Sequence, residues 1–150
     1  MLQKIFITFG VIFIIIGVAG VSYVWNYDHR KAATLEEYAA TDFQVSRDGR
    51  GNLEGAVLSL WDYRYDDAKL LPQATLYIDG ESFELPANTK QTSMDFKNEN
   101  KLFVNFPKAT MKDLQAATEV RLKFSYDNGQ EIDLPLSQGA LLEWQKKMRW

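Results

Sequence analysis

An uncharged, strongly apolar stretch at residues 5–25 limits what this chain can form more than any other part of its sequence. As a helix that rises about 1.5 Å per residue, it would extend about 31 Å, close to the thickness of the hydrocarbon core of a bilayer. Helices in small soluble domains seldom carry apolar side chains on every face. The stretch therefore predicts a single N-terminal transmembrane helix, which we place at residues 5–27 behind a short tail of residues 1–4.

Three aromatic residues, Tyr23, Trp25 and Tyr27, lie at the C-terminal end of this stretch. Side chains that combine an apolar ring with a polar group gather where the hydrocarbon core meets the lipid headgroups. We therefore expect these residues to lie at the membrane interface, with the lipid bilayer as one partner of the chain.

A cleaved signal peptide is the alternative interpretation of the same segment. Lys4 would supply its basic region, residues 5–16 its apolar region, and the small residues at 18–20 its cleavage site. The apolar stretch continues beyond that site to Trp25, which a cleaved peptide does not require. This extra length favours an anchor that stays attached.

The orientation of the anchor is weakly specified by charge, with Lys4 on one side and Arg30 and Lys31 on the other. A long domain behind a short N-terminal tail is typical of a signal anchor, and long domains cross the membrane largely regardless of their charge. We expect the helix in a bacterial inner membrane and the C-terminal domain on its periplasmic side.

Small residues give the predicted helix a notch. Gly10 and Gly17 are seven positions apart, so they lie within about 20° of each other around a helix, and Gly20 extends the notch. Helices in lipid associate through close packing at small residues, which predicts docking onto a transmembrane helix of another subunit. The alternative is that the glycines have no specific role, since glycine is frequent in membrane helices.

The composition becomes that of a soluble protein from Asp28 onward, and we expect a helical neck at residues 28–40. Its alanines favour a helix, and the TLEE sequence at residues 34–37 has the form of a capping box. His29 lies among charged neighbours, where we expect an ordinary solvated side chain.

Residues 41–150 predict one mainly β domain of α+β type, either a β-meander or sandwich-like. A segment of this length can bury enough surface for a single core. The elements that we expect within it are strands at residues 43–47, 56–65, 93–97 and 102–106, a turn at 98–100, a short helix at 111–117 and a C-terminal helix at 137–149.

In two expected hairpins, the positions of the apolar residues predict which residues of the two strands pair. An Asp-Gly pair at residues 79–80 is a favoured two-residue turn. In the second hairpin, a three-residue loop with a left-handed Gly129 matches the apolar faces of the two strands, whereas a two-residue loop would not. The expected pairs are Leu76 with Phe83 in the first hairpin, and Phe124 with Ile132, Leu122 with Leu134 and Val120 with Leu136 in the second.

The composition argues against several classes of function. The 150 residues include no cysteine and a single histidine, which disfavours thiolate or histidine metal sites and most catalytic triads. A formal net charge of −3 with dispersed basic residues disfavours binding to nucleic acid. The sequence contains no phosphate-binding loop or nucleophile motif. We therefore predict no catalytic, cofactor-binding or metal-binding residues and no cofactor.

One group of carboxylates could take part in catalysis or metal binding. It consists of Asp62, Asp66 and Asp67. It could form a divalent-cation site or the acid–base pair of a hydrolase. Arg64 and Lys69 are interspersed with these residues. We favour a solvated loop, because acidic residues are common in turns.

Trp61, Tyr63 and Tyr65 alternate along the expected strand at residues 56–65 and therefore share one of its faces. Aromatic residues in this pattern usually belong to a core or to a contact with another protein. We take the three residues as a candidate partner surface, with a stacking platform for a sugar or a base as the alternative.

Together these features predict a non-enzymatic single-pass membrane protein that serves as an accessory or assembly subunit of a larger membrane complex. One alternative is a tethered periplasmic binding protein, such as an immunity or exclusion factor that acts on an incoming protein. The other is a carboxylate-based hydrolase that uses the acidic group.

Overall fold

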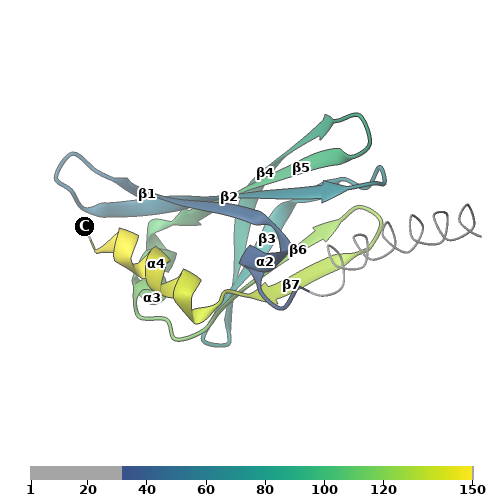
Figure 1. Cartoon of the computed structure of the whole chain (residues 1–150). Helices are drawn as coiled ribbons and strands as arrows, with labels where there is room; N and C mark the ends of the chain where they lie inside the picture. Colours follow the sequence, from purple (N-terminus) through teal and green to yellow (C-terminus); the bar gives the residue numbers. More distant parts are fainter. Residues whose placement is uncertain (1–31, 150) are drawn as a thin grey trace, which may run out of the picture. The chain divides into compact units, whose positions relative to one another are not determined.

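The computed structural model describes residues 32–149, and strands make up 54% of it. Seven antiparallel strands form one curled sheet, and short helices cover its open side (Figure 1). The strands are β1 (Ala40–Arg47), β2 (Leu53–Arg64), β3 (Leu70–Ile78), β4 (Glu81–Ser93), β5 (Asn98–Pro107), β6 (Val120–Tyr126) and β7 (Glu131–Pro135). The helices are α2 (Leu35–Tyr38), α3 (Lys108–Gln115) and α4 (Gln138–Met148).

The predicted tail, the predicted membrane helix and the first part of the neck lie outside the described residues, and the domain boundaries stay predictions. Within residues 32–149, no helix is long and apolar enough to cross a bilayer.

The sheet has the strand order β1-β2-β5-β4-β3-β6-β7. The prediction of a mainly β domain with a short helix and a C-terminal helix is confirmed. The strand order is not that of a simple β-meander, because β2 pairs with β5 and not with β3, and the sheet is not divided into the two sheets of a sandwich. The reason is β4, which pairs with β3 through its first half and with β5 through its second half. This long strand joins both halves into one curled sheet, so two separate sheets do not form.

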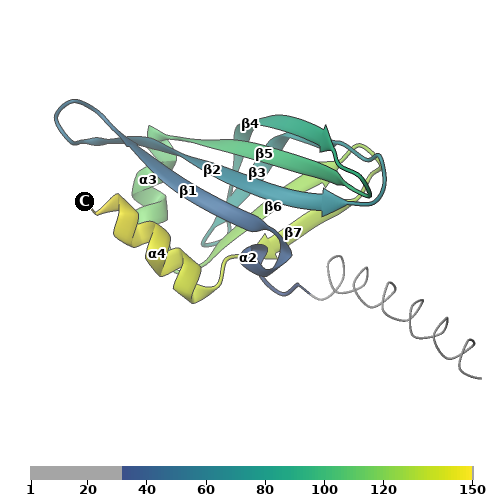
Figure 2. The ribbon, with the colours of Figure 1, turned by 45° about the horizontal axis from the view of Figure 1, so that its top comes forward.

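The core lies on the concave face of the sheet, where alternate residues of the strands point inward. Helices α3 and α4 pack against it, as Figure 2 shows. The indole of Trp144 on α4 stacks on the ring of Phe43 with a centroid distance of 4.3 Å, and it also contacts Phe106. Ser137 caps α4, because its Oγ accepts a hydrogen bond from the N–H of Ala140 at 3.1 Å.

Both predicted hairpin registers are confirmed. Leu76 pairs with Phe83, and the turn residues Asp79 and Gly80 have φ angles of 49° and 87°. Phe124 pairs with Ile132, Leu122 pairs with Leu134, and Gly129 is left-handed with a φ of 89°. The N–H of Leu136 donates to the carbonyl of Val120 at 2.8 Å.

The predicted strand at residues 93–97 and the turn at 98–100 are wrong. The turn lies at residues 94–97, and Asn98 begins β5. Asn98 and Asn100 are accommodated in a strand because their side chains find partners, Asn98 in the loop after β2 and Asn100 on β4. Asn98 Nδ2 donates to the Asp66 carbonyl at 2.7 Å, and Asn100 Oδ1 accepts from Gln91 Nε2 at 3.1 Å.

The capping box expected at residues 34–37 does not form. The Thr34 side chain makes no capping hydrogen bond, and the Glu37 carboxylate accepts from the N–H of Ala33 instead. Helix α2 has four residues, and the extended Ala39 leads directly into β1. Pairing of Ala40 with Trp61 therefore takes residues from the expected end of the helical neck into the sheet.

Candidate functional site

Three aromatic side chains, which we call the aromatic strip, lie at the end of β2, two on its convex face and the third directly after its last residue, Arg64. They are Trp61, Tyr63 and Tyr65, while Leu58 and Leu60 on the opposite face are fully buried. Trp61 is half-buried, and Tyr63 and Tyr65 are 39% and 51% exposed. The alternation expected from the sequence is therefore confirmed for Trp61 and Tyr63, whereas Tyr65 lies just beyond the strand, which ends at Arg64 and not at residue 65 as expected.

Neighbouring polar side chains hold Tyr63 in place. Its hydroxyl donates to Glu99 Oε2 at 3.1 Å, and Lys97 Nζ lies 4.2 Å from the centre of its ring. Glu99 also forms an ion pair with Lys101 at 3.3 Å. The hydrogen bond to Glu99 raises the pKa of Tyr63, so its phenol stays neutral. The ring is thus a fixed contact surface with a polar edge.

A second exposed apolar feature, which we call the hairpin tip, is the turn between β4 and β5 at residues 94–97. Met94 is 49% exposed and Phe96 is 88% exposed. Arg64 near the end of β2 pairs with Asn98 directly behind this turn. Four of the five exposed large hydrophobic side chains among the described residues, namely Tyr63, Tyr65, Met94 and Phe96, therefore gather at one end of the sheet.

The hairpin tip was missed by the sequence interpretation, which assigned it to a strand. A signal for it is present in the sequence, because Met94 and Phe96 are the only apolar residues between Ala87 and Leu102. An isolated apolar pair within so polar a segment cannot supply a core strand.

The interior of the sheet becomes polar at this same end. Asp62 and Arg64 are each 4% exposed. Asp62 Oδ2 accepts a hydrogen bond from the Tyr38 hydroxyl at 2.9 Å and another from the Tyr126 hydroxyl. The Arg64 guanidinium lies 4.2 Å from the centre of the Tyr126 ring and binds the Asp66 carboxylate through two hydrogen bonds of 2.8 and 2.6 Å.

The pKa values of three side chains in this buried cluster are raised. Burial and then the Asp62 carboxylate raise the pKa of Tyr38 and of Tyr126. Hydrogen bonding to Asp66 raises the pKa of Arg64. The cluster therefore holds neutral phenols around a buried carboxylate and a permanently charged guanidinium.

The solvated loop expected for the acidic group is wrong for Asp62, which lies inside the sheet on β2. Asp66 is paired with Arg64, and Asp67 is exposed, with its Oδ1 3.4 Å from Asn98 Nδ2. The three carboxylates thus have different surroundings. Within residues 32–149, no group of three or more histidine or acidic residues is placed to hold a metal ion.

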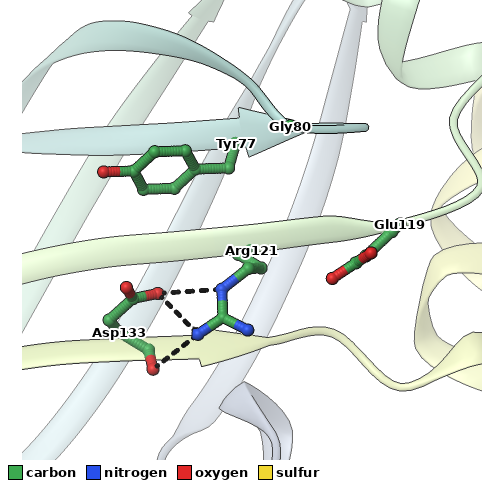
Figure 3. A pocket seen from close by; sticks show the side chains of 5 residues that line it. All are labelled: Tyr77, Gly80, Glu119, Arg121 and Asp133. Carbon is green, nitrogen blue, oxygen red and sulfur yellow. Dashed lines mark hydrogen bonds and ion pairs between the residues drawn. The ribbon is translucent and has the colours of Figure 1, made fainter.

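The hollows in the surface of the described domain include the following two. One of about 320 Å³ is lined by Tyr77, Gly80, Glu119, Arg121 and Asp133 (Figure 3). In it, Arg121 donates to Asp133 Oδ1 at 3.1 Å, so its charge is already compensated. The other hollow, of about 290 Å³, lies where β3 and β4 separate and is lined by Lys69, Leu70, Thr89, Lys90, Gln91 and Asn100.

The remaining residues singled out in the sequence lie outside the described part of the chain. They are the notch residues Gly10, Gly17 and Gly20 and the interface residues Tyr23, Trp25 and Tyr27. Comparisons with protein-family models, curated proteins and solved structures give no match. The surface chemistry of the described domain and the apolar N-terminal stretch thus carry the functional argument.

Proposed function

We propose that this protein is a non-enzymatic, single-pass membrane protein whose anchor helix and exported β-domain pack on partner proteins, as an accessory or assembly subunit of a larger membrane complex. The observation that carries this proposal is the aromatic strip, together with the apolar stretch at residues 5–25. The bacterial inner membrane, with the domain on the periplasmic side, is part of the same proposal.

The aromatic strip supports a protein contact for two physical reasons. Tyrosine and tryptophan are enriched at the centres of protein interfaces, where each buried ring contributes about 1.5–3 kcal/mol. In addition, Tyr63 is already held by Glu99 and Lys97, so little side-chain freedom remains to be lost on binding.

The test is co-purification of the full chain in mild detergent. The variant with Tyr63→Ser and Tyr65→Ser is expected to reduce the recovery of the same partner by at least about tenfold, because a tenfold change corresponds to about 1.4 kcal/mol, less than one buried ring contributes. The matched control is Leu142→Ser, because Leu142 is 60% exposed on α4. Equal recovery with the two variants and the native chain would contradict the role of the strip.

A second experiment separates this proposal from a tethered binding or immunity factor that acts alone. Residues 1–27 are replaced by an unrelated membrane anchor, and Gly10→Leu is made in the native chain. An accessory subunit is expected to lose its partner in both cases, because the notch helix docks in lipid. Full activity with the unrelated anchor would favour the tethered factor instead.

A further inference from the structure

The hairpin tip stands apart from β3, while β5 stays paired with β2 up to Asn98, directly behind the turn. β4 pairs with β3 only from Glu81 to Pro86, and from Ala87 onward it pairs with β5 alone. Figure 1 shows the far half of the β4–β5 hairpin projecting away from β3. Phe96 at its turn is 88% exposed, far more than a side chain that packs against its own domain.

The side chains at this end are arranged in layers. Met94 and Phe96 lie at the turn itself, and Tyr63 lies behind them, with Lys97 over its ring. At a bilayer surface, apolar side chains enter the boundary of the acyl chains, whereas tyrosine and lysine place their polar groups among the headgroups. The order from the tip inward therefore matches the order of chemistry across a membrane interface.

The depth of such a contact is limited by Asp95, which lies between Met94 and Phe96 in the turn. A carboxylate is costly in the hydrocarbon core but not among headgroups. The tip is thus suited to the interface and not to deeper insertion, which for interfacial segments means about 5–10 Å.

We propose that the hairpin tip inserts Met94 and Phe96 into the interface of the same bilayer that holds the N-terminal anchor. This inference rests on the proposed function, because it needs a membrane close to the domain. β1 begins at this end of the sheet, where Ala40 pairs with Trp61. The segment from Trp25 to Leu35, where α2 begins, can extend about 35 Å at most, which is comparable with the diameter of a domain of this size.

The position of the aromatic strip fits this arrangement. Tyr63 pairs with Glu99, one position from the Arg64–Asn98 pair that lies directly behind the tip. A partner that contacts the strip would therefore meet the domain close to the bilayer surface. The tip would set the tilt of the domain and present the strip to that partner.

The test uses the full chain in vesicles of phosphatidylcholine and phosphatidylglycerol. The chain has no cysteine, so one serine at a time is changed to cysteine and labelled with a fluorophore that lipid-attached nitroxides quench. Ser93→Cys reports on the hairpin tip, Ser46→Cys on the exposed far end of β1, and Ser22→Cys on the anchor. All three changes are the same conservative substitution.

The expected result is quenching of the labels at positions 22 and 93 but not of the label at position 46. Adding Met94→Ser and Phe96→Ser should abolish the quenching at position 93. If the label at position 22 is quenched and the label at position 93 is quenched no more than that at position 46, the tip contact is overturned and the anchor stays in place. An unquenched label at position 22 would refute the anchor, and with it both proposals.

A photo-crosslinker attached to the Ser93→Cys variant in native membranes distinguishes lipid from protein as the occupant. Attachment to lipid is the expected result. Attachment to a protein at the hairpin tip would overturn the lipid contact, while the proposed function would stand.

Discussion

At the residue scale, the unusual feature is a buried carboxylate with two phenols and a guanidinium beside it. Asp62 is 4% exposed and accepts hydrogen bonds from Tyr38 and Tyr126. A buried charge is stable only when its neighbours replace the water that it has lost. These partners tie α2, β2 and β6 together at one end of the sheet.

Asp62→Asn is expected to lower the free energy of unfolding by about 2–4 kcal/mol, because it removes a charged acceptor from buried donors. Chemical denaturation followed by circular dichroism measures the change. Asp67→Asn is the matched control, since Asp67 is exposed, and it should shift stability by no more than about 0.5 kcal/mol. Equal effects of the two substitutions would refute a structural role for Asp62.

Alkaline pH should destabilise the domain through Tyr38 and Tyr126. Their folded-state pKa values are raised above 10.0, so the unfolded chain loses these phenol protons first. The stabilisation is complete below about pH 10 and is lost as the pH rises above it, by about 1.4 kcal/mol per pH unit for each phenol. Unfolding at about pH 9 and about pH 11 measures this slope, and the double variant Tyr38→Phe, Tyr126→Phe should flatten it. An unchanged slope in the double variant would contradict the assignment.

At the scale of single elements, the hairpins depend on glycines that adopt left-handed backbone conformations. Gly80 and Gly129 have φ angles of 87° and 89°, and a side chain there would find open space but a strained backbone. Such turns set the register of their strands, and a slip by one residue would turn every buried side chain outward.

Gly129→Ala is therefore expected to destabilise the protein by about 1–2 kcal/mol through backbone strain. Gly139→Ala is the same substitution within α4, where the added methyl meets only Ser137 Oγ at 3.9 Å. That control should be neutral or stabilising by up to about 1 kcal/mol, because alanine favours a helix. Denaturation midpoints compare the two, and a Gly129 variant as stable as the control would contradict the turn assignment.

At the scale of the whole molecule, α4 closes the open side of the curled sheet. Trp144 stacks on Phe43 of β1, and Lys147 Nζ donates to the Phe43 carbonyl at 2.9 Å. Arg47 at the end of β1 donates in turn to the carbonyl of Met148 at 3.0 Å. The last helix thus joins the first strand, and the domain depends on both ends of its described chain.

Trp144→Ala is expected to cost about 3–5 kcal/mol, the usual range for removing a buried large aromatic side chain. Leu142→Ala on the exposed face of the same helix should change stability by no more than about 0.5 kcal/mol. Thermal or denaturant unfolding of the full chain separates the two. A small loss with Trp144→Ala would mean that α4 is not part of the cooperative core.

The candidate site was partly predictable. The shared face of Trp61 and Tyr63 follows from alternation along one strand. The burial of Asp62 does not, because its two tyrosine partners are 24 and 64 positions away in the chain. The hairpin tip was also missed, since the polarity of residues 98–100 suggested a turn that lies at residues 94–97 instead.

By itself, the sequence determined the two hairpin registers, the C-terminal helix and the face that β2 buries, because turn residues and alternation act between near neighbours in the chain. Only the tertiary structure decided that β2 pairs with β5 and β3 with β6, and that Asp62 and Arg64 turn inward. Both features depend on residues from distant segments of the chain. Local patterns assign polar residues to the solvent, but hydrogen bonds and charges from those distant segments allow them to be buried.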